Sequence, residues 1–107
     1  MIRKEKNSLE HREYNIPNRV LRDLSKYAEK YGIQQIILFG SRATGQHTDR
    51  SDIDIAVTGG DFDGFYWDVK EKMHSLLTFD IVNLNDETTE KLIEEIEKDG
   101  VRIYEKA

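Results

Sequence analysis

A chain of 107 residues is expected to form one domain, because a second hydrophobic core needs roughly another hundred residues. Its hydrophobic fraction of 37% supplies one thin, two-layer core, and its net charge of −5 argues against general nucleic-acid binding, which requires a positive face. The lack of cysteine excludes a disulfide framework and fits a cytoplasmic location, and no apolar run reaches the ~20 residues of a membrane span.

The first part of the chain predicts an arm, a helix and a strand. Residues 1–15 are polar and weakly patterned, and we interpret them as an N-terminal arm that precedes a domain over residues 16–107. Pro17 suits the first turn of a helix, and apolar residues three or four positions apart continue this helix to Gly32. The apolar run 36–39, closed by glycine, is typical of a strand covered on both faces.

The middle of the chain predicts a helical turn, two strands and a helix. SRATG begins a short helical turn, and DIDIAV alternates between apolar and polar residues, as a strand with two different faces does. Apolar residues over 62–76 predict a helix of about four turns, capped by Asp61 or Asp63. TFDIVNLN, residues 78–85, is rich in β-branched and aromatic residues and predicts a third strand.

The last part of the chain predicts one more helix and an edge strand. Asp86 is a plausible N-cap for the helix, and Gly100 marks its end. We expect Leu92, Ile93 and Ile96 to form its buried stripe, and VRIYE to form a final edge strand. This order of elements predicts an α/β sandwich in which helices pack on a mixed, mostly buried sheet of three or four strands.

Two aspartates one residue apart make DIDIAV unusual for a strand. A carboxylate inside an apolar strand is costly, and two on one face repel each other. Asp52 and Asp54 project from one face and can reach a common point, and Asp80 lies among apolar residues of another strand. Hard divalent cations with oxygen ligands stabilise such an acidic cluster. We expect magnesium, because few protein ligands leave positions for water and phosphate oxygens.

The Gly-Ser pair that precedes this strand predicts a phosphate-binding turn. Glycine lets the backbone approach a phosphate, and a helix N-terminus offers unpaired N–H groups. Gly40 and Ser41 would provide this turn, Arg42 adds a positive charge, and ten residues separate Ser41 from Asp52. An anion-binding turn followed by a carboxylate pair is the minimum set for a nucleoside triphosphate. A Walker-type loop is excluded, because no lysine follows the second glycine, Gly45.

The stretch GSRATGQHTDRSDIDIAV resembles the signature of the polymerase-beta-type nucleotidyltransferase superfamily, in which Gly-Ser precedes an Asp-x-Asp strand by about ten residues. The short chain resembles in particular the minimal nucleotidyltransferases, bacterial and archaeal proteins commonly paired with a small helical HEPN-domain partner. The resemblance extends from about Pro17 to Tyr104 and implies a single palm-like domain.

The resemblance also implies a reaction and a role for each site residue. Gly40 and Ser41 would hold the triphosphate, and Asp52 and Asp54 would bind two magnesium ions. Asp80 would complete the metal site and help to activate the acceptor hydroxyl. A nucleoside monophosphate would be transferred and pyrophosphate released; in the toxin–antitoxin members the group is AMP, from ATP, and the acceptor is a tyrosine of the HEPN toxin.

Other interpretations compete with these assignments. Asp52 and Asp54 could form a solvated edge, Asp80 could join a salt bridge, and Arg42 could be a surface residue of a short helix. Arg42 and Arg50 are secondary candidates for contacts to phosphate or to the acceptor. A different class of function is a non-catalytic module that binds nucleotide, or nothing, and neutralises a HEPN partner sterically.

The rest of the sequence predicts a contact with a partner protein, and its three histidines are not spaced as the ligands of one metal site. One helix face cannot bury the consecutive aromatics Phe65, Tyr66 and Trp67, so at least one is expected to be exposed for a partner. So small a transferase is expected to receive its acceptor from another protein or to form an oligomer. Three histidines lack metal-ligand spacing and are expected to be structural or solvated: His11, His47 and His74.

Overall fold

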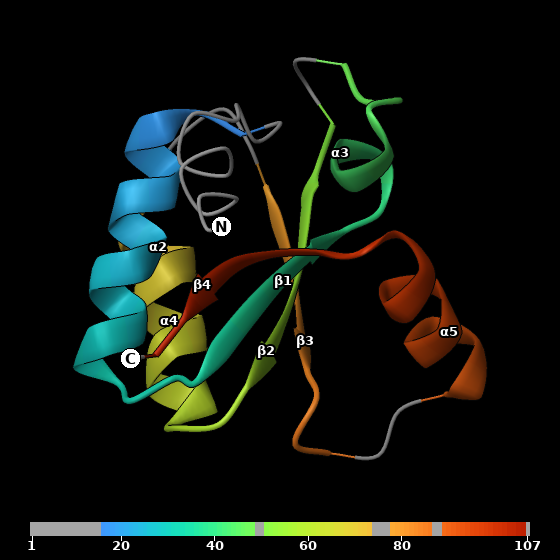
Figure 1. Cartoon of the computed structure of the whole chain (residues 1–107). Helices are drawn as coiled ribbons and strands as arrows, with labels where there is room; N and C mark the ends of the chain where they lie inside the picture. The colour runs from blue at the N-terminus through green and yellow to red at the C-terminus, as the bar shows by residue number, and fades with distance from the viewer. Residues whose placement is uncertain (1–15, 49–50, 74–77, 87–88, 107) are drawn as a thin grey trace, which may run out of the picture.

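The structure is a computed structural model that describes residues 16–48, 51–73, 78–86 and 89–106 (Figure 1). In chain order its elements are α2 (Asn18–Lys30), β1 (Gln35–Phe39), α3 (Ser41–Thr44), β2 (Ile53–Thr58), α4 (Phe62–Lys72), β3 (Phe79–Asn83), α5 (Glu90–Asp99) and β4 (Val101–Glu105). The predicted fold, with helices packed on a mixed sheet, is confirmed.

The sheet has four strands in the order β3-β2-β1-β4. β1 runs antiparallel to both β2 and β4, whereas β2 runs parallel to β3. A parallel pair needs a crossover connection, and α4 lies in the segment that joins β2 to β3. β4 is an edge strand, as the sequence predicted, and β3 forms the opposite edge.

Different helices cover the two faces of the sheet: α2 and α4 lie on one face and α5 on the other (Figure 1). The α2/α4 face carries the larger core, to which alternate residues of the strands point. Burial of one Leu, Ile or Phe side chain contributes roughly 1.5–3 kcal/mol. Its fully buried side chains include Leu24, Ile33, Ile36, Leu38, Ile53, Ile55, Val57, Phe65 and Val69. The α5 face has a smaller buried core of Phe39, Ala56 and Ile96.

α2 follows the predicted periodicity, since Val20, Leu24 and Ala28 are its buried residues at spacings of four. Pro17 is the N-cap of this helix, one position before the first turn in which the sequence placed it. The helix ends shortly before Gly32, which has a φ of 69°. Within the described residues, no helix is long and apolar enough to cross a membrane.

α4 is shorter than the predicted helix of about four turns. Asp61 is its N-cap, one of the two predicted candidates, and accepts a hydrogen bond from the backbone N–H of Gly64 at 3.1 Å. The helix has 11 residues and ends at Lys72. The further predicted residues 74–76 lie outside the described part of the chain.

α5 begins later than predicted and buries a narrower stripe. Its N-cap is Thr89, whose hydroxyl accepts from the N–H of Leu92 at 3.2 Å, so the prediction of Asp86 was wrong. Asp86 instead accepts from the side-chain amide of Asn83 at 3.3 Å, within the turn that follows β3. Ile93 is 39% exposed and does not join the buried stripe. It is rotated away from the sheet, which α5 contacts through a narrow core.

Candidate functional site

The register of the sheet brings the predicted aspartates onto one face. Asp54 of β2 is paired with Asp80 of the parallel strand β3 and with Phe39 of β1. Side chains of paired residues point to the same face, and so do those of residues two apart along a strand. Asp52, just before β2, therefore shares the face of Asp54 and Asp80. This is the α5 face, since Phe39 packs in the core of α5.

Asp54 is the half-buried member of the three, whereas Asp52 and Asp80 are exposed. Burial, together with the negative charges of Asp80, Asp52 and Glu95, raises the pKa of Asp54 from its ordinary value of 3.8 to about 6. The three carboxylates place negative charge on one face of the sheet, and a positive ion bound there would relieve their mutual repulsion.

Thr78 holds the side chain of Asp52 in place, a contact that the sequence did not predict. Its hydroxyl donates a hydrogen bond to Asp52 Oδ1, and its carbonyl accepts from the N–H of Ile53 at 2.8 Å. The residue before β3 thus holds both the start of β2 and the side chain that precedes it. The sequence shows a threonine two residues before Asp80. It indicates a contact with Asp52 only once the parallel register of β2 and β3 is known.

Gly40 turns the chain from β1 into α3 and lies against Asp54. Its φ of 75° and ψ of −155° define a backbone conformation that belongs essentially to glycine. A Cβ atom at this position would collide with Asp54 Oδ2 and lie 3.2 Å from Asp54 Cγ. Ser41, half-buried, is the first residue of α3. The Gly-Ser turn is therefore adjacent to the aspartate that forms the centre of the acidic group.

Arg42 is buried, so the interpretation of this residue as a surface position of a short helix was wrong. Its side chain is 4% exposed. Its Nε donates to the carbonyl of Ser51 at 3.1 Å, and its Nη2 donates to the carbonyl of Thr48 at 3.3 Å. Arg42 thus holds the loop that leads into β2, and its contact with nucleotide stays a prediction. Arg50 lies outside the described residues.

The carboxylate oxygens of the three aspartates suit a hard cation, although their side chains do not converge on one point in this structure. In the described part of the chain, no group of three or more His, Cys, Asp or Glu side chains is arranged to hold a metal ion. Three carboxylates on one face nevertheless supply oxygen ligands of the kind that magnesium takes, and rotation of their side chains can bring them together.

Of the three histidines, His47 lies in the described part of the chain, in the loop that follows α3. It is half-buried, and its buried Nδ1 has no hydrogen-bond partner among the described residues. His11 and His74 lie outside them. His47 does not form part of a metal-ligating group in the residues that can be described.

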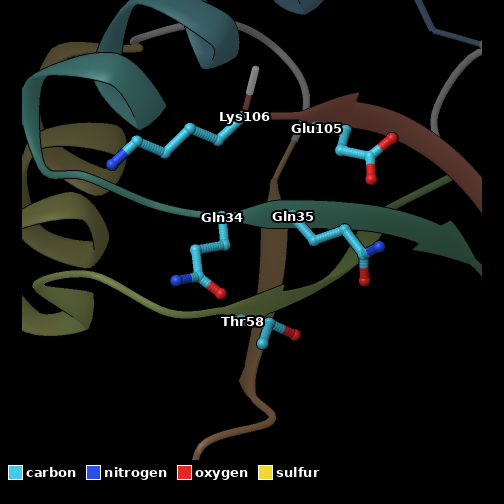
Figure 2. Close-up of a pocket in the computed structure, with 5 residues that line it drawn as sticks. All are labelled: Gln34, Gln35, Thr58, Glu105 and Lys106. Atoms are coloured by element: carbon cyan, nitrogen blue, oxygen red, sulfur yellow. The ribbon is translucent and has the colours of Figure 1, made fainter.

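A hollow of about 440 Å³ lies at the end of the sheet opposite to the three aspartates (Figure 2). Its lining residues are Gln34, Gln35, Thr58, Glu105 and Lys106. Gln35 is paired with Thr58 and with Glu105 at the start of β1, whereas Asp54 is paired with the last residue of this strand. Figure 2 shows the side chains of Glu105 and Lys106 pointing away from each other. The hollow is therefore separate from the acidic group.

Trp67 provides the exposed aromatic that the sequence predicted. It is 60% exposed on α4, whereas Phe65, two residues earlier, is fully buried. Its ring lies edge-on to Tyr66, with the centroids 5.2 Å apart. The expectation that this aromatic contacts a partner stays a prediction.

Comparisons with known proteins agree with this fold. The family described as "Polymerase beta, Nucleotidyltransferase" matches residues 22–107. A toxin–antitoxin crystallised with AMP-PNP is 27% identical, with a TM-score of 0.64 and coverage of 80% of this chain and 73% of that chain.

Two mutant MntA-HpeT toxin–antitoxin structures are also similar. The first, with two aspartates replaced by glutamate, is 25% identical, with a TM-score of 0.63 and coverage of 80% of this chain and 73% of that chain. The second, with a tyrosine replaced by alanine, is 27% identical, with a TM-score of 0.61 and coverage of 85% and 74%. No curated protein matches the sequence.

Proposed function

Because the chain belongs to the polymerase beta nucleotidyltransferase family, we propose that it transfers AMP from ATP to a hydroxyl group of a partner protein. The observation that carries this proposal is the position of Asp54, paired with Asp80 across the sheet and in contact with the Gly40 turn. A triphosphate needs an anion-binding turn and carboxylates for its cations at adjacent positions. The similar toxin–antitoxin structure with AMP-PNP supports ATP as the donor.

Magnesium is the cofactor that these residues fit best. Asp52, Asp54 and Asp80 would hold it, with two ions expected, and the ions would relieve the repulsion that, besides burial, raises the pKa of Asp54. When bound, the ions neutralise phosphate charge and polarise the reacting oxygens. Thr78 orients Asp52 for this task through its hydrogen bond to Oδ1.

The protein contributes position and electrostatics to an in-line displacement. The acceptor oxygen bonds to the α-phosphorus as the bond to the departing pyrophosphate breaks, and the acceptor loses its proton. Gly40 and Ser41 hold the phosphates, and Arg42 supports the loop to β2 from within. Asp80, exposed on the edge strand β3, is accessible to a protein acceptor and helps to draw the proton from its hydroxyl group.

The partner is proposed to be a helical HEPN-domain toxin, with this chain as its antitoxin in the cytoplasm. Similar structures are toxin–antitoxin complexes, and the exposed Trp67 provides an aromatic side chain for such a contact. The acceptor in this proposal is a tyrosine hydroxyl of the toxin. The protein would then function within a hetero-oligomer that the toxin completes.

Intact-mass analysis tests this proposal. The protein is incubated with ATP, Mg²⁺ and the product of the neighbouring gene, and the partner is expected to gain the mass of one AMP group. Asn at both Asp52 and Asp54 should abolish the gain, whereas the control Asp63→Asn, on exposed α4 surface, should preserve it. If the partner is bound and inhibited but gains no mass, the non-catalytic module is the correct function.

A further inference from the structure

The outer side of β3 is held by a lysine of α4. β3 is an edge strand, and among the described residues β2 is its one neighbour in the sheet. The carbonyl of Thr78 accepts a hydrogen bond from the N–H of Ile53 in β2 at 2.8 Å. Successive carbonyls along a strand point to opposite sides, so the carbonyl of Phe79 points away from β2, to the open edge. There it accepts a hydrogen bond from Lys70 Nζ at 2.6 Å.

The ammonium group of Lys70 has a second partner on its own helix. Its Nζ lies 5.5 Å from the centroid of the Tyr66 ring, one turn earlier on α4. Tyr66 in turn contacts the rings of Phe62 and Trp67, whose centroids lie 5.8 Å and 5.2 Å from its own. A charged donor forms a stronger hydrogen bond than a neutral one, and the face of an aromatic ring attracts the same charge. The ammonium is therefore held at the edge of β3, although Lys70 is an exposed residue.

This hydrogen bond acts directly on the backbone of Asp80. The carbonyl of Phe79 and the N–H of Asp80 belong to one planar peptide unit, so a bond to the carbonyl fixes the orientation of the whole unit. Asp80 is the residue that β3 pairs with Asp54. An interior strand is supported from both sides, whereas the outer side of an edge strand lacks a neighbouring strand. Lys70 therefore supplies on the outer side of β3 the support that β2 supplies on the inner side.

We propose that Lys70 is a positioning residue for nucleotidyl transfer, which holds Asp80 in place beside Asp54 through the carbonyl of Phe79. This role rests on the proposed function, in which Asp80 binds a cation and draws the proton from the acceptor. Both tasks need a carboxylate whose backbone stays in place, because a displacement of about 1 Å can cost about a hundredfold in rate. Lys70 itself contacts neither the nucleotide nor the acceptor.

Hydrogen exchange at the amide of Asp80 tests the contact without nucleotide or partner. Lys70→Met keeps the length of the side chain and removes its ammonium, and should raise the exchange rate of this amide about tenfold. The amide of Leu38, in the interior strand β1, reports on the stability of the whole sheet and should change less than about twofold. Lys70→Arg keeps a charged donor and should restore most of the protection at Asp80.

The kinetics of AMP transfer connect this contact to the reaction. Lys70→Met should lower kcat about tenfold, while the KM for ATP changes less than about twofold because the Gly40 turn is intact. Lys70→Arg should again lie closer to the wild type. Lys72→Met is the matched control, since it removes the same charge two residues later on α4, where the ammonium pairs with Asp68 at 3.4 Å. This control should keep the kcat of the wild type.

Four results would overturn the inference. They are a wild-type exchange rate at Asp80 or a wild-type kcat in Lys70→Met, an equal rise of exchange at Leu38, an equal loss of kcat in Lys72→Met, and the lack of any recovery in Lys70→Arg. Absence of AMP transfer by the wild-type protein would instead refute the proposed function, on which the exchange of the Asp80 amide does not depend.

Discussion

Replacement of Gly40 by alanine should damage both the stability and the activity of the protein. The φ of 75° and ψ of −155° place Gly40 in a region that is essentially restricted to glycine, and another residue there costs about 1–3 kcal/mol. The new Cβ would also collide with Asp54 Oδ2. The Asp54 side chain can rotate away from the new Cβ, so the loss of stability comes mainly from backbone strain. The loss of activity comes from the displacement of the Asp54 carboxylate.

Urea unfolding and AMP transfer measure these two effects separately. Gly40→Ala should lower the free energy of unfolding by about 2–3 kcal/mol and reduce transfer strongly. The matched control is Gly45→Ala, which also has a positive φ, 83°, but meets no atom within 4 Å of its new Cβ. It lies in the left-handed helical region, where alanine costs about 1–2 kcal/mol, and should remain active.

A double variant assigns the loss of stability to its cause. In Gly40→Ala with Asp54→Ala, the steric contact is removed but the unfavourable backbone conformation remains. The double variant should therefore recover a small part of the lost stability. The reasoning is refuted if Gly40→Ala is as stable and active as the wild type, or if the second substitution restores stability completely.

Three further predictions concern the structure around the site. Thr89→Ala should lower the free energy of unfolding by about 1 kcal/mol through loss of the α5 N-cap, while Asp86→Ala changes it by less than about 0.5 kcal/mol; equal effects in urea would contradict the assignment of the cap. Arg42→Lys should cost about 1–3 kcal/mol in the same assay, because one ammonium cannot replace a guanidinium that donates to two carbonyls, and wild-type stability would show that these bonds contribute nothing. The hydrogen bond from Tyr31 lowers the pKa of Asp68, so the charged carboxylate stabilises the fold above about pH 4, its unfolded value, and this contribution is lost as the pH falls through the lower folded value. The stability difference between wild type and Asp68→Asn should therefore shrink from about pH 5 to pH 2, and a difference independent of pH would contradict the assignment.

The sequence predicted elements whose signals are local and missed those that depend on packing. Asp61 was a candidate cap for α4 because the turn before the helix determines it. Asp86 and Thr89 are both common capping residues three positions apart, and the sequence does not show which one directs α5 onto the sheet. Ile93 has the spacing of a buried residue, but α5 covers a small core that is filled by Ile96 and its neighbours.

In the candidate site, too, the sequence predicted the features that depend on local signals and missed those that depend on packing. An antiparallel pair of strands brings Gly40 close to Asp54, so their spacing in the sequence is informative. The position of Asp80 depends on the parallel register of β2 and β3, which residue types do not determine. Arg42 could not be predicted as buried, because the carbonyls that accept its hydrogen bonds belong to the following loop.

Transfer of label from ATP to the partner protein tests the central claim most directly. ATP labelled at the α-phosphate should label the partner in the presence of Mg²⁺, and ATP labelled at the γ-phosphate should not, because AMP is transferred and pyrophosphate leaves. The variant with Asn at both Asp52 and Asp54 should transfer neither label while it keeps the unfolding midpoint of a folded protein. Transfer of the γ-label, or undiminished α-label transfer by the double variant, would contradict nucleotidyl transfer at these aspartates.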